Sequence, residues 1–224
     1  MDWQAIQLTI KLAACTTLVL MCVALPLAAW IAYSRRRFGP GVAEAIVALP
    51  LVLPPTVLGY YTLVALGPNS PLGQAFIAVF GTTLPFTFWG LLIASVAYSL
   101  PFAVQPLISS FRAVDHKLLE ASACLGAGRF ETFGRVIVPM ARPGVVAAIV
   151  LSFVHTIGEF GVVLMVGGSI AGETRTVSIA IYDHVQELNY SAANQTALVL
   201  LVFSFAVLFL LYGLKLPGVH VGRK

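Results

Sequence analysis

Residues 16–37 read TTLVLMCVALPLAAWIAYSRRR, an apolar run that ends in three consecutive arginines. Together with the residues before it, the run reaches the ~20 residues that a helix needs to cross the hydrocarbon core of a bilayer. A cleavable signal peptide carries its positive charge before the apolar run, whereas here the charge follows it. The stretch therefore predicts a helix that stays in the membrane.

The composition extends this conclusion to the whole chain. Hydrophobic residues make up 59% of the 224 residues and charged residues only 10%, against roughly 25% charged residues in a typical soluble domain. The mean hydropathy is +0.93. A soluble protein of this length needs a polar surface that this composition does not provide. The net charge of +4 does not indicate a nucleic-acid partner, because no basic stretch is interleaved with a polar, base-stacking surface.

Five segments are apolar and long enough to span a membrane. Each must be helical, because lipid offers no hydrogen-bond partner to an open backbone amide. The predicted spans are residues 10–33, 42–66, 84–108, 145–166 and 193–214. The connection 67–83 begins with a turn signal, Gly-Pro-Asn-Ser-Pro. The sequence therefore predicts an all-α, polytopic transmembrane bundle of about five spans, which we treat as one domain over residues 1–224.

The basic residues predict the orientation of this bundle. Eleven of the thirteen Lys and Arg residues lie in the first connection, in the third connection or after the last span; they are Arg35, Arg36, Arg37, Arg112, Lys117, Arg129, Arg135, Arg142, Lys215, Arg223 and Lys224. With five spans all three regions fall on one side, and the positive-inside rule makes that side the cytoplasm. The N-terminus is then predicted outside and the C-terminus inside.

The long third connection, 109–144, predicts a helix–Gly–helix hairpin at the cytoplasmic surface. Asp115 is a plausible N-cap, and apolar residues then recur at helical spacing at Leu118, Ala121 and Leu125. Gly126 and Gly128 can end this helix in a left-handed turn. A second short helix is expected from 129 to 138, with Pro139 stopping it. Such a hairpin either merely joins two spans or forms a docking surface for a cytoplasmic partner.

The residues of the hairpin favour the second interpretation. Glu120-Ala121-Ser122, three residues, Gly126, nine residues and then Val-Ile-Val before Pro139 resemble the EAA loop of ABC importer permeases. That pattern reads Glu-Ala-Ala, three residues, Gly, nine residues, then Ile-x-Leu-Pro. The departures are Ser122 for the second alanine and two valines for Ile and Leu. The candidate coupling residues are therefore Glu120, Ala121, Ser122, Gly126 and Pro139.

The resemblance implies a mechanical role for this hairpin. In that family it sits in a cleft of a separate ATPase subunit, and closure of the ATPase dimer on ATP moves the two hairpins and the spans with them. The permease subunit itself is not an enzyme and carries no cofactor, since ATP and Mg belong to the ATPase. In agreement with this, the sequence contains no GxxxxGK[ST] phosphate-binding loop.

The candidate pore or gate residues lie in the outer half of the spans. Glu159 is the single charge in the fourth span, flanked by Gly158 and Gly161, and an intramembrane charge usually faces a cavity or a partner. It either lines the pathway or makes a structural hydrogen bond at a helix break. A carboxylate is a poor direct ligand for an anion.

Two further features belong to this group. Arg175 is the only arginine on the predicted outer side, and pairing with Glu159 or Glu173 is favoured over contact with an arriving anion. The segment 49–56, which contains Pro54 and Pro55, predicts a kinked helix that lines a cavity, or a static bend. Residues 177–188 look like a surface helix at the outer leaflet, which receives a binding protein or rests in the interface.

Taken together, LPLVLPP at 49–55, GEFG at 158–161 and GETRT at 172–176 resemble the molybdate branch of the ABC permease family, over about residues 5–215. Related sulfate and tungstate permeases share parts of these motifs. The resemblance implies a homodimer in the lipid of a bacterial inner membrane, two cytoplasmic ATPase subunits, and a periplasmic binding protein that selects the anion.

Two other classes of function remain as alternatives. An ATP-independent channel or secondary transporter would lack the ATPase-coupling motif. A membrane enzyme would need clustered acid–base or metal groups, but the four histidines are scattered: His116, His155, His184 and His220. His155 and Glu159 are four residues apart and share a helix face, yet no third metal ligand is apparent, so no metal site is predicted.

Overall fold

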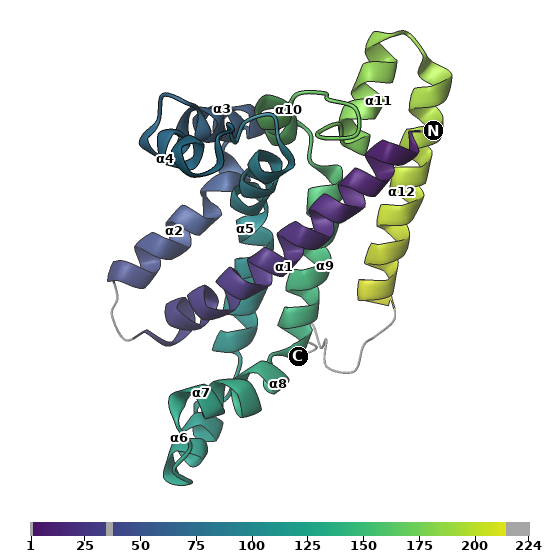
Figure 1. Ribbon diagram of the computed structural model, residues 1–224. Coiled ribbons are helices and arrows are strands. Elements are labelled where there is room, and N and C mark those ends of the chain that lie inside the picture. Colours follow the sequence, from purple (N-terminus) through teal and green to yellow (C-terminus); the bar gives the residue numbers. More distant parts are fainter. Residues whose placement is uncertain (1, 35–37, 214–224) are drawn as a thin grey trace.

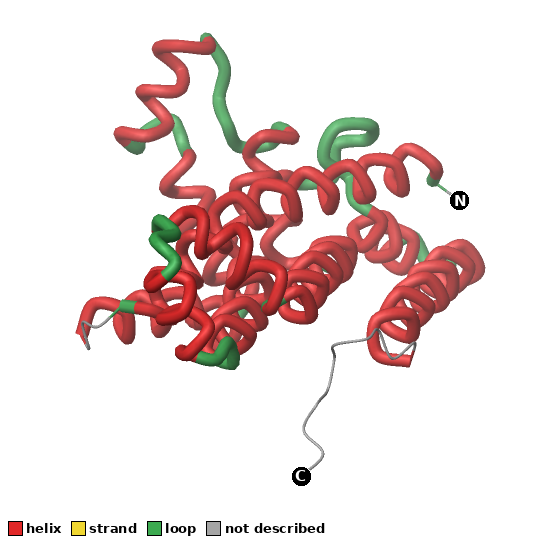
Figure 2. Tube along the Cα trace, turned by 90° about the horizontal axis from the view of Figure 1, so that it is seen from below, coloured by secondary structure: helices red, strands yellow, loops and turns green. Residues whose placement is uncertain are grey.

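The computed structural model describes residues 2–34 and 38–213, and within these ranges every regular element is a helix (Figures 1 and 2). The helices are α1 (Trp3–Tyr33), α2 (Phe38–Val52), α3 (Pro55–Leu66), α4 (Pro71–Phe80), α5 (Phe88–Arg112), α6 (His116–Cys124), α7 (Arg129–Thr132), the π-helix η1 (Phe133–Ile137), α8 (Val138–Met140), α9 (Arg142–Gly158), α10 (Gly161–Gly167), α11 (Val177–Gln186) and α12 (Tyr190–Gly213). The all-α prediction is confirmed. Six basic residues and one histidine used above lie outside the described residues: Arg35, Arg36, Arg37, Lys215, Arg223, Lys224 and His220.

Three of the described helices, α1, α5 and α12, are each long and apolar enough to cross a membrane. Two further pairs qualify when each bent pair is taken as one span: α2 with α3, and residues 129–140 with α9. The count is thus three to five. α1 has 31 residues, or about 46 Å at 1.5 Å per residue, and it runs obliquely across the other helices (Figure 1).

The predicted second span, 42–66, is two helices that meet at an angle of 114°. Pro50 lies inside α2, Pro54 has extended backbone angles, and Pro55 opens α3. A proline removes a backbone donor and pushes the residue before it out of the helical region, so two consecutive prolines end one helix and start the next. The predicted kink is present, but it separates two helices and is not a bend within one continuous helix.

The connection predicted at 67–83 contains a helix, α4, that was not predicted. The Ser70 hydroxyl accepts a hydrogen bond from the Gly73 amide at 2.8 Å, and Pro71 occupies the first turn. Gly81 ends the helix with φ +71°, a left-handed conformation that suits glycine. The Gly-Pro-Asn-Ser-Pro segment that predicted a turn therefore also contains the N-cap and the first residue of α4.

The core lies where α1 crosses α5 and α9. Small side chains let α1 and α5 approach closely, among them the fully buried Ala24, Ala28 and Ala103. At the same end of the bundle the Tyr33 hydroxyl donates to the Phe111 carbonyl oxygen at 2.7 Å. By contrast, α12 is largely exposed; its apolar surface suits lipid or another subunit.

The two ends of the bundle carry different elements. The N-terminus of α1, α11 and the start of α12 lie at one end, and the hairpin α6–α8 projects from the other (Figure 1). The predicted surface helix 177–188 is α11, in which Val177, Ile179 and Ala180 are buried. The helix ends two residues earlier than predicted, at Gln186, and Leu188 beyond it is exposed.

Candidate functional site

The hairpin α6–α8 has the predicted start, but of the two glycines predicted in a left-handed turn only Gly126 has a positive φ. The Asp115 carboxylate accepts from the Lys117 amide at 2.9 Å and caps α6. Gly126 has φ +81°, while Gly128 has φ −70° and caps α7. A Cβ added to Gly126 would meet no atom of the described chain within 4 Å. The requirement for glycine at residue 126 is therefore one of backbone conformation and not of a clash within the subunit.

The second arm of the hairpin differs from the prediction. Pro139 was expected to stop the helix, but the arm continues as a π-helix and α8 to Met140, and Pro139 lies within the first turn of α8. Proline has no amide to continue the i→i−4 hydrogen bonds of an α-helix, and it lies directly after the point where the π-helix gives way to α8. The chain then enters α9 directly at Arg142.

Ser122 ties the two arms of the hairpin together. This residue is buried, and its hydroxyl lies 2.8 Å from the Thr132 hydroxyl. Ser122 stands where the resembled motif has alanine, so the departure supplies an additional link between α6 and α7. An ion pair of 2.7 Å between Arg135 and Glu131 lies on the second arm.

The apolar stripe predicted on α6 does not pack on the subunit. Leu118 is 40% exposed and Leu125 is 87% exposed, and Phe130 at the start of α7 is 94% exposed. Leu119 is the side chain that packs on the core instead. Glu120 and Ala121 are also exposed. The hairpin thus presents apolar and charged side chains outward.

A second site surrounds Glu159, at the point where the predicted fourth span is broken. α9 ends at Gly158, Glu159 is extended, and α10 begins at Gly161. The Glu159 carboxylate is buried. It accepts a hydrogen bond of 2.6 Å from Ser95 at Oε2 and another of 2.6 Å from Ser99 at Oε1. The structural hydrogen bond at a helix break, considered from the sequence, is present.

An open cleft of about 530 Å³ lies beside this buried cluster. Its lining combines both broken helices and α5, and consists of Pro55, Thr56, Tyr98, Val154, His155, Gly158, Glu159, Phe160 and Gly161. A Cβ on Gly158 would enter open space, whereas one on Gly161 would lie 3.0 Å from the Pro55 Cβ. The candidate residues Gly158, Glu159, Gly161 and Pro55 therefore meet at one place, while Pro54 lies at the adjoining bend.

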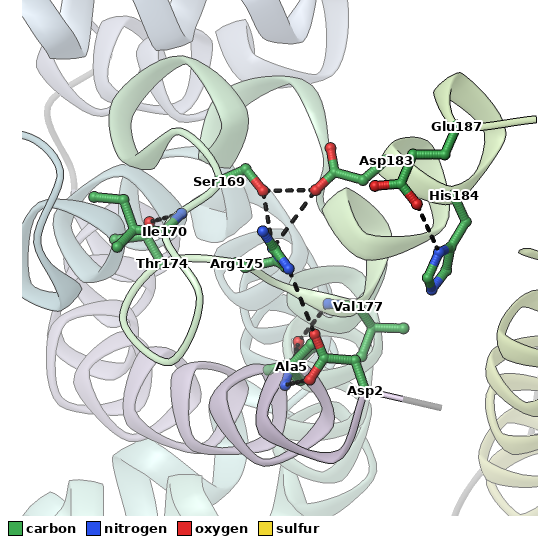
Figure 3. A network of polar contacts seen from close by, with 11 residues as sticks. Asp2, Ala5, Ser169, Ile170, Thr174, Arg175, Val177, Asp183, His184 and Glu187 are labelled. Carbon is green, nitrogen blue, oxygen red and sulfur yellow. Dashed lines mark hydrogen bonds and ion pairs between the residues drawn. The ribbon is translucent and has the colours of Figure 1, made fainter. Parts of the chain in front are cut away.

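Arg175 lies in a different polar network, at the N-terminal end of α1 (Figure 3). Its Nε lies 3.0 Å from the Ser169 hydroxyl and 3.5 Å from Asp183 Oδ2, and its Nη1 lies 3.9 Å from Asp2 Oδ2. The Ser169 hydroxyl also donates to Asp183 at 2.6 Å. The predicted pairing of Arg175 with Glu159 or Glu173 was wrong, because the loop that carries Arg175 folds over α11 and the α1 N-cap.

Several residues of these sites were not predicted from the sequence. Ser95 and Ser99 were not singled out, although two serines four residues apart in an apolar helix place hydroxyls on one face. Asp2 and Asp183 were missed because nothing local connects them with residue 175. No group of three metal-ligating side chains occurs among the described residues.

The comparisons with known proteins identify the family. A model of the binding-protein-dependent transport system inner membrane component matches residues 24–215. The chain belongs to this family. It is thus a multi-pass inner-membrane transport component, and the predictions of an ABC permease fold and of this localisation are confirmed.

Relatives of this inner membrane component agree with the family assignment. The molybdenum transport system permease protein of Azotobacter vinelandii is 53% identical over 94% of this chain and 93% of its own length. The sulfate transport system permease protein of Salmonella typhimurium is 34% identical over 82% of this chain and 66% of its own length. A crystal structure of a bacterial alginate ABC transporter with a periplasmic protein shares the fold, with a TM-score of 0.75, 16% identity, and coverage of 93% of this chain and 76% of that one.

Proposed function

We propose that this inner membrane component is the permease subunit of a molybdate importer. The observation that carries the proposal is the 53% identity to the molybdenum permease of Azotobacter vinelandii, which extends over nearly the full length of both chains. The sulfate permease relative is less similar and extends beyond the matched region. Tungstate has nearly the same size, shape and charge as molybdate, so it is the expected second substrate.

We infer an assembly of two copies of this chain, two cytoplasmic ATPase subunits and one outer binding protein. The exposed side chains of the hairpin, including Leu125 and Phe130, support an ATPase docking surface. The hairpin and its basic residues lie at the end opposite the N-terminus of α1, which supports the N-out, C-in orientation by the positive-inside rule. The cleft beside Glu159 is open and not enclosed by this chain, as expected of a pathway shared by two copies.

The substrate is tested by uptake into proteoliposomes that contain the permease, its ATPase and its binding protein. With ATP at the ATPase side, labelled molybdate should accumulate, tungstate should compete at similar concentrations, and sulfate should compete only at a large excess. A non-hydrolysable ATP analogue is the control. Accumulation of sulfate in preference to molybdate would overturn the substrate assignment, and accumulation without ATP would favour a channel or secondary transporter.

The coupling hairpin is tested by a matched pair of tryptophan substitutions. Gly126 and Gly81 both have left-handed backbones, with φ +81° and φ +71°, and a Cβ on either would meet open space. Backbone strain is therefore similar in Gly126→Trp and Gly81→Trp, but only residue 126 lies on the hairpin. We expect Gly126→Trp to insert normally, to lose co-purification with the ATPase and to lose transport.

Gly81→Trp serves as the control for backbone strain, and it should retain both co-purification and transport. Equal losses in both variants would mean that strain, and not docking, explains the result. Normal co-purification and transport by Gly126→Trp would remove the assigned role of the hairpin.

A further inference from the structure

The His155 side chain faces the cleft and is held from behind by the Glu159 cluster. Its Nδ1 lies 2.9 Å from the Ser99 hydroxyl oxygen and 3.4 Å from Glu159 Oε1. The ring stacks on Phe102, with centroids 3.8 Å apart, and lies 4.9 Å from the Tyr98 ring. Ring position and ring plane are therefore both fixed.

The hydrogen bonds decide which nitrogen of His155 carries a proton. Ser99 has one hydroxyl proton, and it donates this proton to Glu159 Oε1 at 2.6 Å. Ser99 must then accept from both neighbours that lie 2.9 Å away, His155 Nδ1 and the Thr156 hydroxyl. Nδ1 consequently carries a proton that points back to the cluster, and Nε2 is the nitrogen left for the cleft.

The charges around the cleft favour an anion at this nitrogen. Of the nine described residues that line the cleft, His155 is the only one that can become positively charged. The Glu159 carboxylate is buried and turned toward two serine hydroxyls, so its negative charge is partly satisfied before an anion arrives. The titratable groups against the ring are Glu159 and Tyr98, since α3 contributes only Pro55 and Thr56.

We propose that His155 is a contact for the transported oxyanion, which it meets with an Nε2–H donor when the imidazole is doubly protonated. Ser99 and Glu159 are positioning residues that hold the ring. This inference rests on the proposed function as an anion importer and deepens it. A neutral ring protonated on Nδ1 has only a lone pair at Nε2 and repels an oxyanion, whereas the protonated ring forms a charge-assisted hydrogen bond with it.

The test measures molybdate uptake per ATP hydrolysed in proteoliposomes with the complete complex. We expect His155→Gln to lower this ratio by about tenfold, the size expected for one charge-assisted hydrogen bond. The control is Ile149→Val, a conservative change at an exposed residue of the same helix outside the cleft lining, which should leave the ratio within about twofold of the unmodified complex. ATPase stimulation by the binding protein should survive in both variants.

Three outcomes overturn the inference. An unchanged uptake ratio in His155→Gln means that the imidazole does not meet the transported anion. A proportional loss of ATPase stimulation and uptake in His155→Gln means that His155 only braces the helix break. An unmodified complex that hydrolyses ATP but carries no molybdate, tungstate or sulfate overturns the proposed function itself, and the inference with it.

Discussion

The turn at Gly126 allows one prediction in which the same chemical change has opposite effects at two nearby positions. Gly126→Ala places a Cβ on a residue with φ +81°, and a left-handed conformation costs an L-residue roughly 1–2 kcal/mol. Because a Cβ there meets no described atom within 4 Å, no steric contribution adds to this figure. The hairpin should therefore open roughly 5- to 30-fold more often.

Gly134 provides the matched control. It lies inside the π-helix η1, and a Cβ there also meets no atom within 4 Å. Glycine within a helix costs roughly 0.5–1 kcal/mol relative to alanine, so Gly134→Ala should make opening about two- to fivefold rarer. The two substitutions thus have the same chemistry, the same open surroundings and opposite expected signs.

Hydrogen exchange followed by mass spectrometry on the permease in nanodiscs, without the ATPase, measures these effects. Amides in the peptide 116–124 should exchange faster in Gly126→Ala and those in 133–137 slower in Gly134→Ala, while peptides from α1 serve as an internal reference. Shifts of the same sign in both variants, or unchanged exchange in Gly126→Ala, would refute the assignment of the turn to backbone conformation.

Three further predictions follow from other contacts. Ser122→Ala should raise hairpin opening about two- to tenfold by removing the hydroxyl contact with Thr132, and a double-mutant cycle with Thr132→Val that gave no coupling would contradict this. Gly158→Leu should leave thermal unfolding of the complex nearly unchanged but abolish molybdate uptake, because its side chain enters the open cleft; normal uptake would show that the cleft is not on the pathway. Asp183→Asn should lower stability in detergent by about 1 kcal/mol, because Asp183 meets both the loop arginine and a serine hydroxyl. Asp2→Asn should change stability by less than about 0.5 kcal/mol, since asparagine is an equally good N-cap. Equal losses of stability in the thermal melts of Asp183→Asn and Asp2→Asn would contradict the larger contribution assigned to Asp183.

The hairpin could be predicted from sequence because its determinants are local. The Asp115 cap, the left-handed Gly126 and the spacing to Pro139 all lie within one short segment, and each acts through the backbone of its neighbours. The direction of the α6 stripe could not be predicted, because leucines at helical spacing look alike whether they face the subunit's own core or a partner. Leu118 and Leu125 are exposed, so the pattern identified a helix but not its covered face.

The hydrogen-bond partners of Glu159 could not be predicted from the residues near it in the sequence. The break at this residue was indicated by its flanking glycines, but its hydrogen-bond donors lie on α5, 60 and 64 positions away along the chain. The partner of Arg175 was wrongly predicted for the same reason. Its loop returns to α1 at Asp2, and only the tertiary fold brings that terminus to residue 175.

The two broken helices explain how a carboxylate is accommodated at this depth. The break after α2 and the break after α9 meet, because the added Cβ of Gly161 would lie 3.0 Å from the Cβ of Pro55, and α10 packs along α3. Irregular backbone at membrane depth is tolerated only where it is buried in protein or lines a cavity. Here one side of the α9 break is filled by the hydroxyls that bind Glu159, and the other side opens to the cleft. The same interruption therefore buries the negative charge and leaves His155 as the cleft-lining side chain that can carry a positive charge, an arrangement that suits the proposed anion pathway.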